Sequence, residues 1–174
     1  NKNIIILGAG ESGVGAALLA QHQGYDVFVS DGGKIADNFK QELKNAGISF
    51  EENGHTEEKI FAADTVIKSP GIADENLLVK KIAAANISII SEIEFAWQHK
   101  KDSKVIAITG SNGKTTTTSM LYHMCKLADL NCAMVGNIGV SFARQIVQDP
   151  KEYYIVEVSS FQLDNIINFK ADVA

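Results

Sequence analysis

The chain has 174 residues, of which 45% are hydrophobic, and its formal net charge is −5 at pH 7. This length suits one large domain or two small ones with a buried core. The acidic balance argues against general nucleic-acid binding, which needs a basic face. No apolar run approaches the roughly 18 residues that span a bilayer, and no secretion leader is visible. We therefore expect a cytoplasmic protein with no nucleic-acid or membrane partner.

Cysteine and histidine spacing gives no sign of a metal site. Cys125 and Cys132 lie in apolar surroundings without C-x-x-C spacing, so we expect reduced, buried thiols, with a disulfide as the weaker alternative. The histidines also lack ligand spacing, and we interpret all four as structural or solvated: His22, His55, His99 and His123.

Strand and helix signals alternate along the chain, which predicts an α/β fold with mostly parallel sheets. In the first half, strands are expected at Asn3–Leu7, Asp26–Ser30, Ile48–Glu51, Thr65–Ile67 and Ile87–Ile90. Helices are expected at Gly13–Gln23 and near Ile35–Ala46. Asp74 is expected to cap a further helix, whose apolar face is Leu78, Ile82 and Ala85.

The segment H-K-K-D-S-K, which begins at His99, is polar and charged and follows a helical stretch, Glu92–Gln98. It predicts an inter-domain linker around Ser91–Lys104. Beyond it, strands are expected at Val105–Thr109, Asn131–Val135 and Tyr154–Val158, and helices at Lys114–Ala128 and Val140–Val147. Ala171–Ala174 resembles the opening of one more strand, so we expect an incomplete second domain.

The stretch Ile106–Thr118, I-A-I-T-G-S-N-G-K-T-T-T-T, is typical of a phosphate-binding loop between a strand and a helix. It is shorter than the common G-x-x-x-x-G-K-[ST] pattern, because Ile108 stands where the first glycine would be. We expect the loop to bind a nucleoside triphosphate through Gly110, Ser111, Asn112, Gly113, Lys114, Thr115 and Thr116. The alternative is a glycine-rich turn with a chance lysine.

A second glycine loop, Gly8–Gly13, matches G-x-G-x-x-G after a strand, and Asp31 ends the next strand. This arrangement suits any diphosphate-linked nucleoside, including a UDP-sugar, with Asp31 accepting from ribose hydroxyls. Two alternatives are an NAD-dependent oxidoreductase and glycines that serve packing only. The two loops predict a Rossmann-like domain at residues 1–92, followed by part of a P-loop α/β domain at residues 93–174.

Three further positions follow strands and can line these sites. The turn Ser69-Pro70-Gly71 can line the same crevice as the first loop, although a plain turn would need no function. Asn137 lies in a tight G-N-I-G loop and offers both a donor and an acceptor. Glu157 ends a strand beside the phosphate loop, where a carboxylate suits Mg²⁺.

Together these motifs resemble the Mur ligase family. The resemblance rests on T-G-S-N-G-K-T-T-T from Thr109, G-N-I-G from Gly136 and E-V-S-S-F-Q-L from Glu157. S-P-G-I from Ser69 and S-E-I-E-F from Ser91 agree with it. The G-N-I-G and E-V-S-S-F-Q-L motifs are most similar to those of the members that add D-glutamate.

The resemblance implies an ATP- and Mg²⁺-dependent, amide-forming step in peptidoglycan precursor synthesis. An acyl phosphate made from UDP-N-acetylmuramoyl-L-alanine would be attacked by the amine of D-glutamate. It implies catalytic roles for Lys114, Glu157 and Asn137, and Mg²⁺ binding by Thr115 and Glu157. Substrate binding, including its UDP part, is implied for Gly10, Glu11, Ser12, Gly13, Asp31, Ser69, Pro70, Gly71, Asn137 and Ser159.

The chain also departs from the family pattern. Gly32-Gly33 follows Asp31 where some members have Thr-Arg, so the uracil contact must come from elsewhere, with Lys34 as the candidate. The family's later histidine, bridging lysine and third domain are not in this sequence. We therefore expect the chain to be inactive by itself. We also expect a monomer, and a module that only binds a nucleotide sugar is a further alternative.

Overall fold

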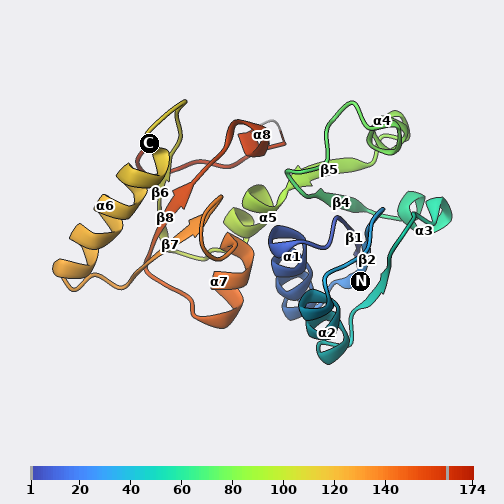
Figure 1. Ribbon diagram of the computed structural model, residues 1–174, viewed down its shortest axis with the longest axis horizontal. Coiled ribbons are helices and arrows are strands. Elements are labelled where there is room, and N and C mark those ends of the chain that lie inside the picture. The colour runs from blue at the N-terminus through green and yellow to red at the C-terminus, as the bar shows by residue number, and fades with distance from the viewer. Residues whose placement is uncertain (1, 164) are drawn as a thin grey trace.

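The computed structural model describes residues 2–163 and 165–174, which form two parallel α/β units (Figure 1). The first has a five-stranded sheet in the order β3-β2-β1-β4-β5. Along the chain its strands are β1 Asn3–Leu7, β2 Asp26–Ser30, β3 Ser49–Glu51, β4 Thr65–Lys68 and β5 Ser88–Ser91. Its helices are α1 Glu11–His22, α2 Asp37–Asn45, α3 Glu57–Phe61 and α4 Leu77–Ala84. This order confirms the predicted fold class.

Strand β1 lies at the centre of the first sheet and is buried on both faces, which explains its continuous apolar sequence. Ile4 and Ile6 join the core that includes α1, while Ile5 and Leu7 pack on the opposite face with Ile82 of α4. Because β1 and β4 are neighbours at the point where the strand order reverses, a crevice forms beyond their carboxyl ends.

The second unit has a three-stranded parallel sheet in the order β6-β8-β7. Its elements are β6 Lys104–Ile108, α6 Lys114–Leu127, β7 Cys132–Gly136, α7 Phe142–Gln148, β8 Tyr153–Glu157 and α8 Ser160–Leu163. Near the last residue, Val173 forms a parallel bridge with Ile106, where we predicted the start of a strand. Both cysteines are free and buried, as predicted.

Helix α5, Glu92–Gln98, lies between the two units (Figure 1), and it confirms the helical stretch that we predicted with these bounds at the start of the inter-domain segment. Residues 92–96 are buried against α1 and α7. Its two buried glutamates accept from backbone N–H groups: Glu92 Oε1 accepts from Ala143 N at 2.5 Å, and Glu94 Oε2 accepts from the N–H groups of residues 167–169. Glu92 Oε2 is buried without a hydrogen-bond partner among the described residues. The predicted domain boundary after residue 92 falls at the start of this helix.

Smaller differences concern helix ends and short helices. Asn76, not Asp74, caps α4, because its Oδ1 accepts from Leu78 N at 2.9 Å. The sequence did not predict α3 or α8, which have only five and four residues. In the part of the chain that the structure describes, we find no helix with the length and apolar character needed to cross a membrane.

Candidate functional site

The loop between β6 and α6 has the backbone geometry of an anion cradle. Gly110 has a φ of 143° and Gly113, the N-cap of α6, has a φ of 76°, both in the region that favours glycine. No side chain caps α6, so its first N–H groups face the loop without a side-chain acceptor. Lys114 Nζ donates to the carbonyl oxygen of Gly110 at 2.6 Å, which holds the ammonium group at the rim.

Glu157 lies in register between Ile108 at the end of β6 and Gly136 at the end of β7. The residue is 1% exposed. Asn137 Nδ2 donates to one carboxylate oxygen, Oε1, at 3.0 Å, while the other, Oε2, is buried without a hydrogen-bond partner among the described residues. An unpaired buried carboxylate oxygen is costly, and a bound cation would satisfy it.

The chemistry of the donors fits Mg²⁺ held together with a polyphosphate. Within residues 2–163 and 165–174, no cluster of three or more histidines, cysteines or acidic residues could hold a metal alone. Mg²⁺ usually takes one or two protein oxygens, with waters and phosphate oxygens filling its octahedron. Among the described residues, Glu157 Oε2 and the exposed Thr115 hydroxyl, at the start of α6, offer oxygen ligands of this kind.

A backbone contact fixes Asn137 next to Glu157, whereas Ser159 is held by a neighbouring side chain. Asn137 N donates to Glu157 O at 2.9 Å, and a Cβ on Gly136 would lie 2.3 Å from that oxygen, so glycine is required there. Ser159 donates to Gln162 Oε1 through both N and Oγ, at 2.9 and 3.0 Å. Sequence reasoning did not single out Gln162, although it lies within the E-V-S-S-F-Q-L motif.

The first glycine loop is closed by its own acid. Asp31 Oδ2 accepts from Ala9 N at 2.6 Å, and Oδ1 accepts from Gly33 N at 2.8 Å. A Cβ on Gly13 would lie 1.8 Å from Gly8 O, so this glycine permits α1 to begin directly against the loop. Gly10 is the N-cap of α1 and no side chain caps it, which leaves the helix start open to a diphosphate.

Glu11 and Ser12 open this helix, but the carboxylate of Glu11 points to the second unit. Glu11 Oε1 accepts from Ser141 N at 3.0 Å and from Arg144 Nε at 2.8 Å, and Arg144 also pairs with Glu42. These acids, with burial opposing, raise the pKa of Arg144 above its usual value. The Glu11 carboxylate is therefore occupied by residues of the second unit. Contact between a ligand and the backbone N–H of Glu11 stays a prediction. Sequence reasoning did not single out Arg144.

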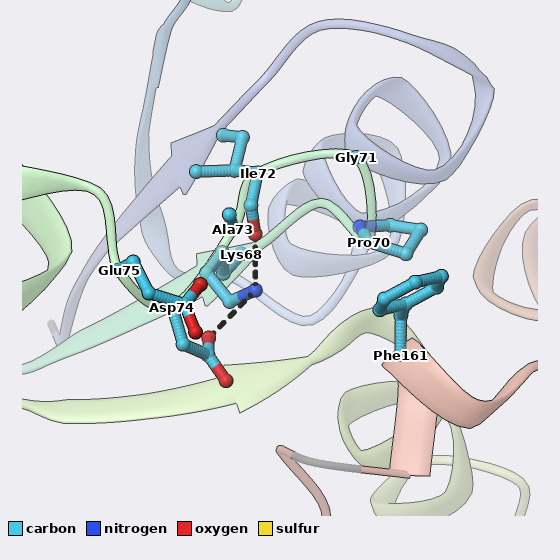
Figure 2. Close-up of a pocket in the computed structure, with 8 residues that line it drawn as sticks. All are labelled: Lys68, Pro70, Gly71, Ile72, Ala73, Asp74, Glu75 and Phe161. Carbon is cyan, nitrogen blue, oxygen red and sulfur yellow. Dashed lines mark hydrogen bonds and ion pairs between the residues drawn. The ribbon is translucent and has the colours of Figure 1, made fainter.

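The turn after β4 faces α8 across a cavity of about 440 Å³ (Figure 2). Pro70 and Gly71 line one side, and the ring of Phe161, which is 69% exposed, lines the other. The turn is held by buried Lys68, whose Nζ donates to Ile72 O at 2.6 Å and pairs with Asp74 at 3.0 Å. Ser69 donates to Gly8 O at 3.3 Å, which ties this turn to the first glycine loop.

The predicted site residues thus form two groups at the carboxyl ends of the two sheets. Gly110–Lys114, Asn137 and Glu157 gather at the second sheet, and Gly8–Gly13, Asp31 and Ser69 gather at the first. The cavity of Figure 2, between Pro70 and Phe161, lies between the two units.

Two family models match the chain: MurD N-terminal domain over residues 3–77 and Mur ligase middle domain over residues 108–174. Among curated relatives, the UDP-N-acetylmuramoylalanine--D-glutamate ligase of Bacteroides fragilis is 54% identical over 99% of this chain, and that of Bacteroides thetaiotaomicron is 55% identical over 99%. This chain spans only 39% of the length of each of these relatives.

Solved structures agree on the fold. A murein peptide ligase of Psychrobacter arcticus matches 92% of this chain and 39% of its own, with a TM-score of 0.60 at 23% identity. A pseudomurein peptide ligase type C of Methanothermus fervidus matches 92% of this chain and 33% of its own, with a TM-score of 0.54 at 29% identity. With both family models matched in chain order, this chain belongs to the Mur ligase family.

Proposed function

We propose that this chain is the UDP-substrate-binding and ATP-binding part of a cytoplasmic ligase that adds D-glutamate to UDP-N-acetylmuramoyl-L-alanine. Support comes from the names of relatives that are 54% and 55% identical over nearly the whole chain. The observation that carries the proposal is the buried, unpaired Glu157 oxygen beside the phosphate loop. The alternative function, an NAD-dependent oxidoreductase, uses only the first glycine loop and gives the unpaired Glu157 oxygen no role.

In this proposal the second unit binds ATP. The N–H groups from Gly110 to Thr116 hold the β- and γ-phosphates, and Lys114 leaves Gly110 O to pair with them. Thr115 and Glu157 hold Mg²⁺, with Asn137 fixing the Glu157 carboxylate. When bound, Mg²⁺ neutralises charge on the phosphates during transfer.

The chemistry has two steps. The terminal carboxylate of the substrate attacks the γ-phosphorus of ATP, which gives an acyl phosphate and ADP. The D-glutamate amine then attacks the acyl carbon, forming the amide and releasing inorganic phosphate. Such transfer depends chiefly on positioning and on charge stabilisation, which Lys114 and the loop N–H groups supply.

The first unit binds the UDP part. The open start of α1 at Gly10–Gly13 takes the diphosphate, while Asp31 holds the loop through Ala9 N and borders the ribose. The muramoyl part would then cross the cavity between Pro70–Gly71 and Phe161 toward Ser159 and Asn137. We propose a division after residue 92 and a monomeric chain, in which Arg144 and Glu11 join the two units.

The test uses the full-length protein that carries this chain. With UDP-N-acetylmuramoyl-L-alanine, ATP and Mg²⁺, phosphate release should require D-glutamate and should not occur with L-glutamate. The 174-residue chain alone should bind UDP-N-acetylmuramoyl-L-alanine in calorimetry without turnover. Phosphate release that ignores D-glutamate, or turnover by the short chain, would contradict the proposal.

A further inference from the structure

A small cavity lies beside Asp31, at the end of the first loop away from α1. It has a volume of about 250 Å³ and is lined in part by Asp31, Gly32, Gly33, His55 and Asn76. A Cβ on Gly32 would lie 2.9 Å from His55 Nε2, so the imidazole fills the space above this glycine. His55, in the segment after β3, thus occupies space that a side chain at position 32 would fill.

A chain of hydrogen bonds sets which nitrogen of His55 carries the proton. Ser30 Oγ donates its single proton to Glu51 Oε1 at 2.6 Å and contacts His55 Nδ1 at 2.7 Å. Since that proton is already used, Ser30 must accept from Nδ1–H. Burial opposes the charge of Glu51, but hydrogen bonds from Ser30 and Thr56 outweigh it and lower the pKa of Glu51, which keeps it an acceptor.

With Nδ1 protonated, the Nε2 of neutral His55 carries a lone pair at the cavity wall. Among the described residues, no hydrogen bond to Nε2 is found. Asn76 adds the opposite character, because its Oδ1 accepts from Leu78 N and no hydrogen bond to another described residue uses its amide N–H groups. The cavity therefore offers an acceptor from His55 and a donor from Asn76.

We propose that His55 is the residue that selects the nucleobase, by accepting the N3–H of a uracil ring. Uracil presents an N–H between two carbonyl oxygens, which matches a cavity that offers one acceptor and one donor. Cytosine presents a lone pair at the same position, and it would face the lone pair of Nε2. This inference rests on the proposed function and names a specificity residue for its nucleotide site, where the Gly32-Gly33 pair carries no side chain.

Calorimetric titration of the 174-residue chain with UDP and with CDP tests the inference. The wild-type chain should bind UDP about tenfold or more tightly than CDP, the range expected for one hydrogen bond gained against one acceptor left unpaired. His55→Ala should bring the two affinities to within about threefold. His22→Ala, at the exposed end of α1, is the matched control and should keep the wild-type ratio.

Two readouts do not depend on removing the ring. The ¹⁵N spectrum of His55 should show the Nδ1–H tautomer, and Ser30→Ala should lower the UDP-to-CDP ratio while the ring remains. An Nε2–H tautomer, or an unchanged ratio in His55→Ala with UDP still bound, would overturn the inference and leave the proposed function standing. Failure of the wild-type chain to bind UDP would overturn both.

Discussion

The two glycine loops share a strand-turn-helix layout, but they use their acids in opposite ways. At the first loop, both oxygens of Asp31 accept from backbone N–H groups, so the loop is held rigid before any ligand arrives. At the second loop, one oxygen of Glu157 has no partner in the described part of the chain, and the Lys114 ammonium group rests on a loop carbonyl. The acid of the first loop is thus satisfied by the protein itself, whereas the acid beside the second loop has an oxygen left for a bound cation.

The largest expected effect is at Lys114. In the full-length protein, Lys114→Ala should lower D-glutamate-dependent phosphate release by about 10²–10³-fold, the usual loss for a positioned group that stabilises transition-state charge. Lys126→Ala, on the same helix and exposed, should keep wild-type turnover. Retention of most of the wild-type activity by Lys114→Ala would contradict the proposal that the second loop stabilises charge on the transferred phosphoryl group.

Alanine at matched glycines should separate the two loops by stability. A Cβ on Gly13 would meet Gly8 O at 1.8 Å, so Gly13→Ala should cost roughly 3 kcal/mol or more of the free energy of unfolding, as overpacking against backbone does. At Gly113 no atom lies within 4 Å of the added Cβ, and only the positive φ opposes it, which costs about 1–2 kcal/mol.

Urea denaturation of the 174-residue chain measures both effects. Gly10→Ala is the control, because its φ is −82° and its Cβ would meet nothing within 4 Å. Equal losses at Gly13 and Gly113 would show that the first loop is not the more tightly closed one.

The stability of the chain should depend on pH through α5, the helix between the two units. Burial raises the pKa of Glu92 to about 7, with Glu11 adding to the rise and the Ala143 N–H opposing it. The folded state therefore binds a proton that the unfolded state has lost above pH 4.5, and stability should fall as pH rises toward 7. Glu92→Gln should increase the free energy of unfolding at pH 8 by up to about 3 kcal/mol, with little change at pH 4.

Denaturant unfolding at the two pH values provides the measurement. The exposed Glu58→Gln serves as the matched control and should follow the wild-type pH profile. A Glu92→Gln chain that loses stability equally at both pH values would indicate that the carboxylate is ionised in the folded state, despite its burial.

Local patterns predicted the parts of the molecule whose cause is local. Strand β1 could be predicted from its apolar run, and both loops from their glycines, because burial and turn geometry restrict residue type at those positions. The direction in which the Glu11 side chain points could not be predicted, since its partner Arg144 lies 133 positions away in the sequence. The role of α5 was missed for a similar reason: Glu92 and Glu94 look solvated until the backbone donors that they accept from are known.

The most direct test of the difference between the two loops is the Mg²⁺ dependence of ATP binding to the 174-residue chain. Wild-type chain should bind ATP more tightly with Mg²⁺ than with EDTA, and Glu157→Gln should lose most of that gain, about tenfold or more in Mg²⁺ affinity. Glu152→Gln, exposed just before β8, should keep it. A Glu157→Gln chain with the wild-type Mg²⁺ dependence would contradict the assignment of the unpaired oxygen to the metal.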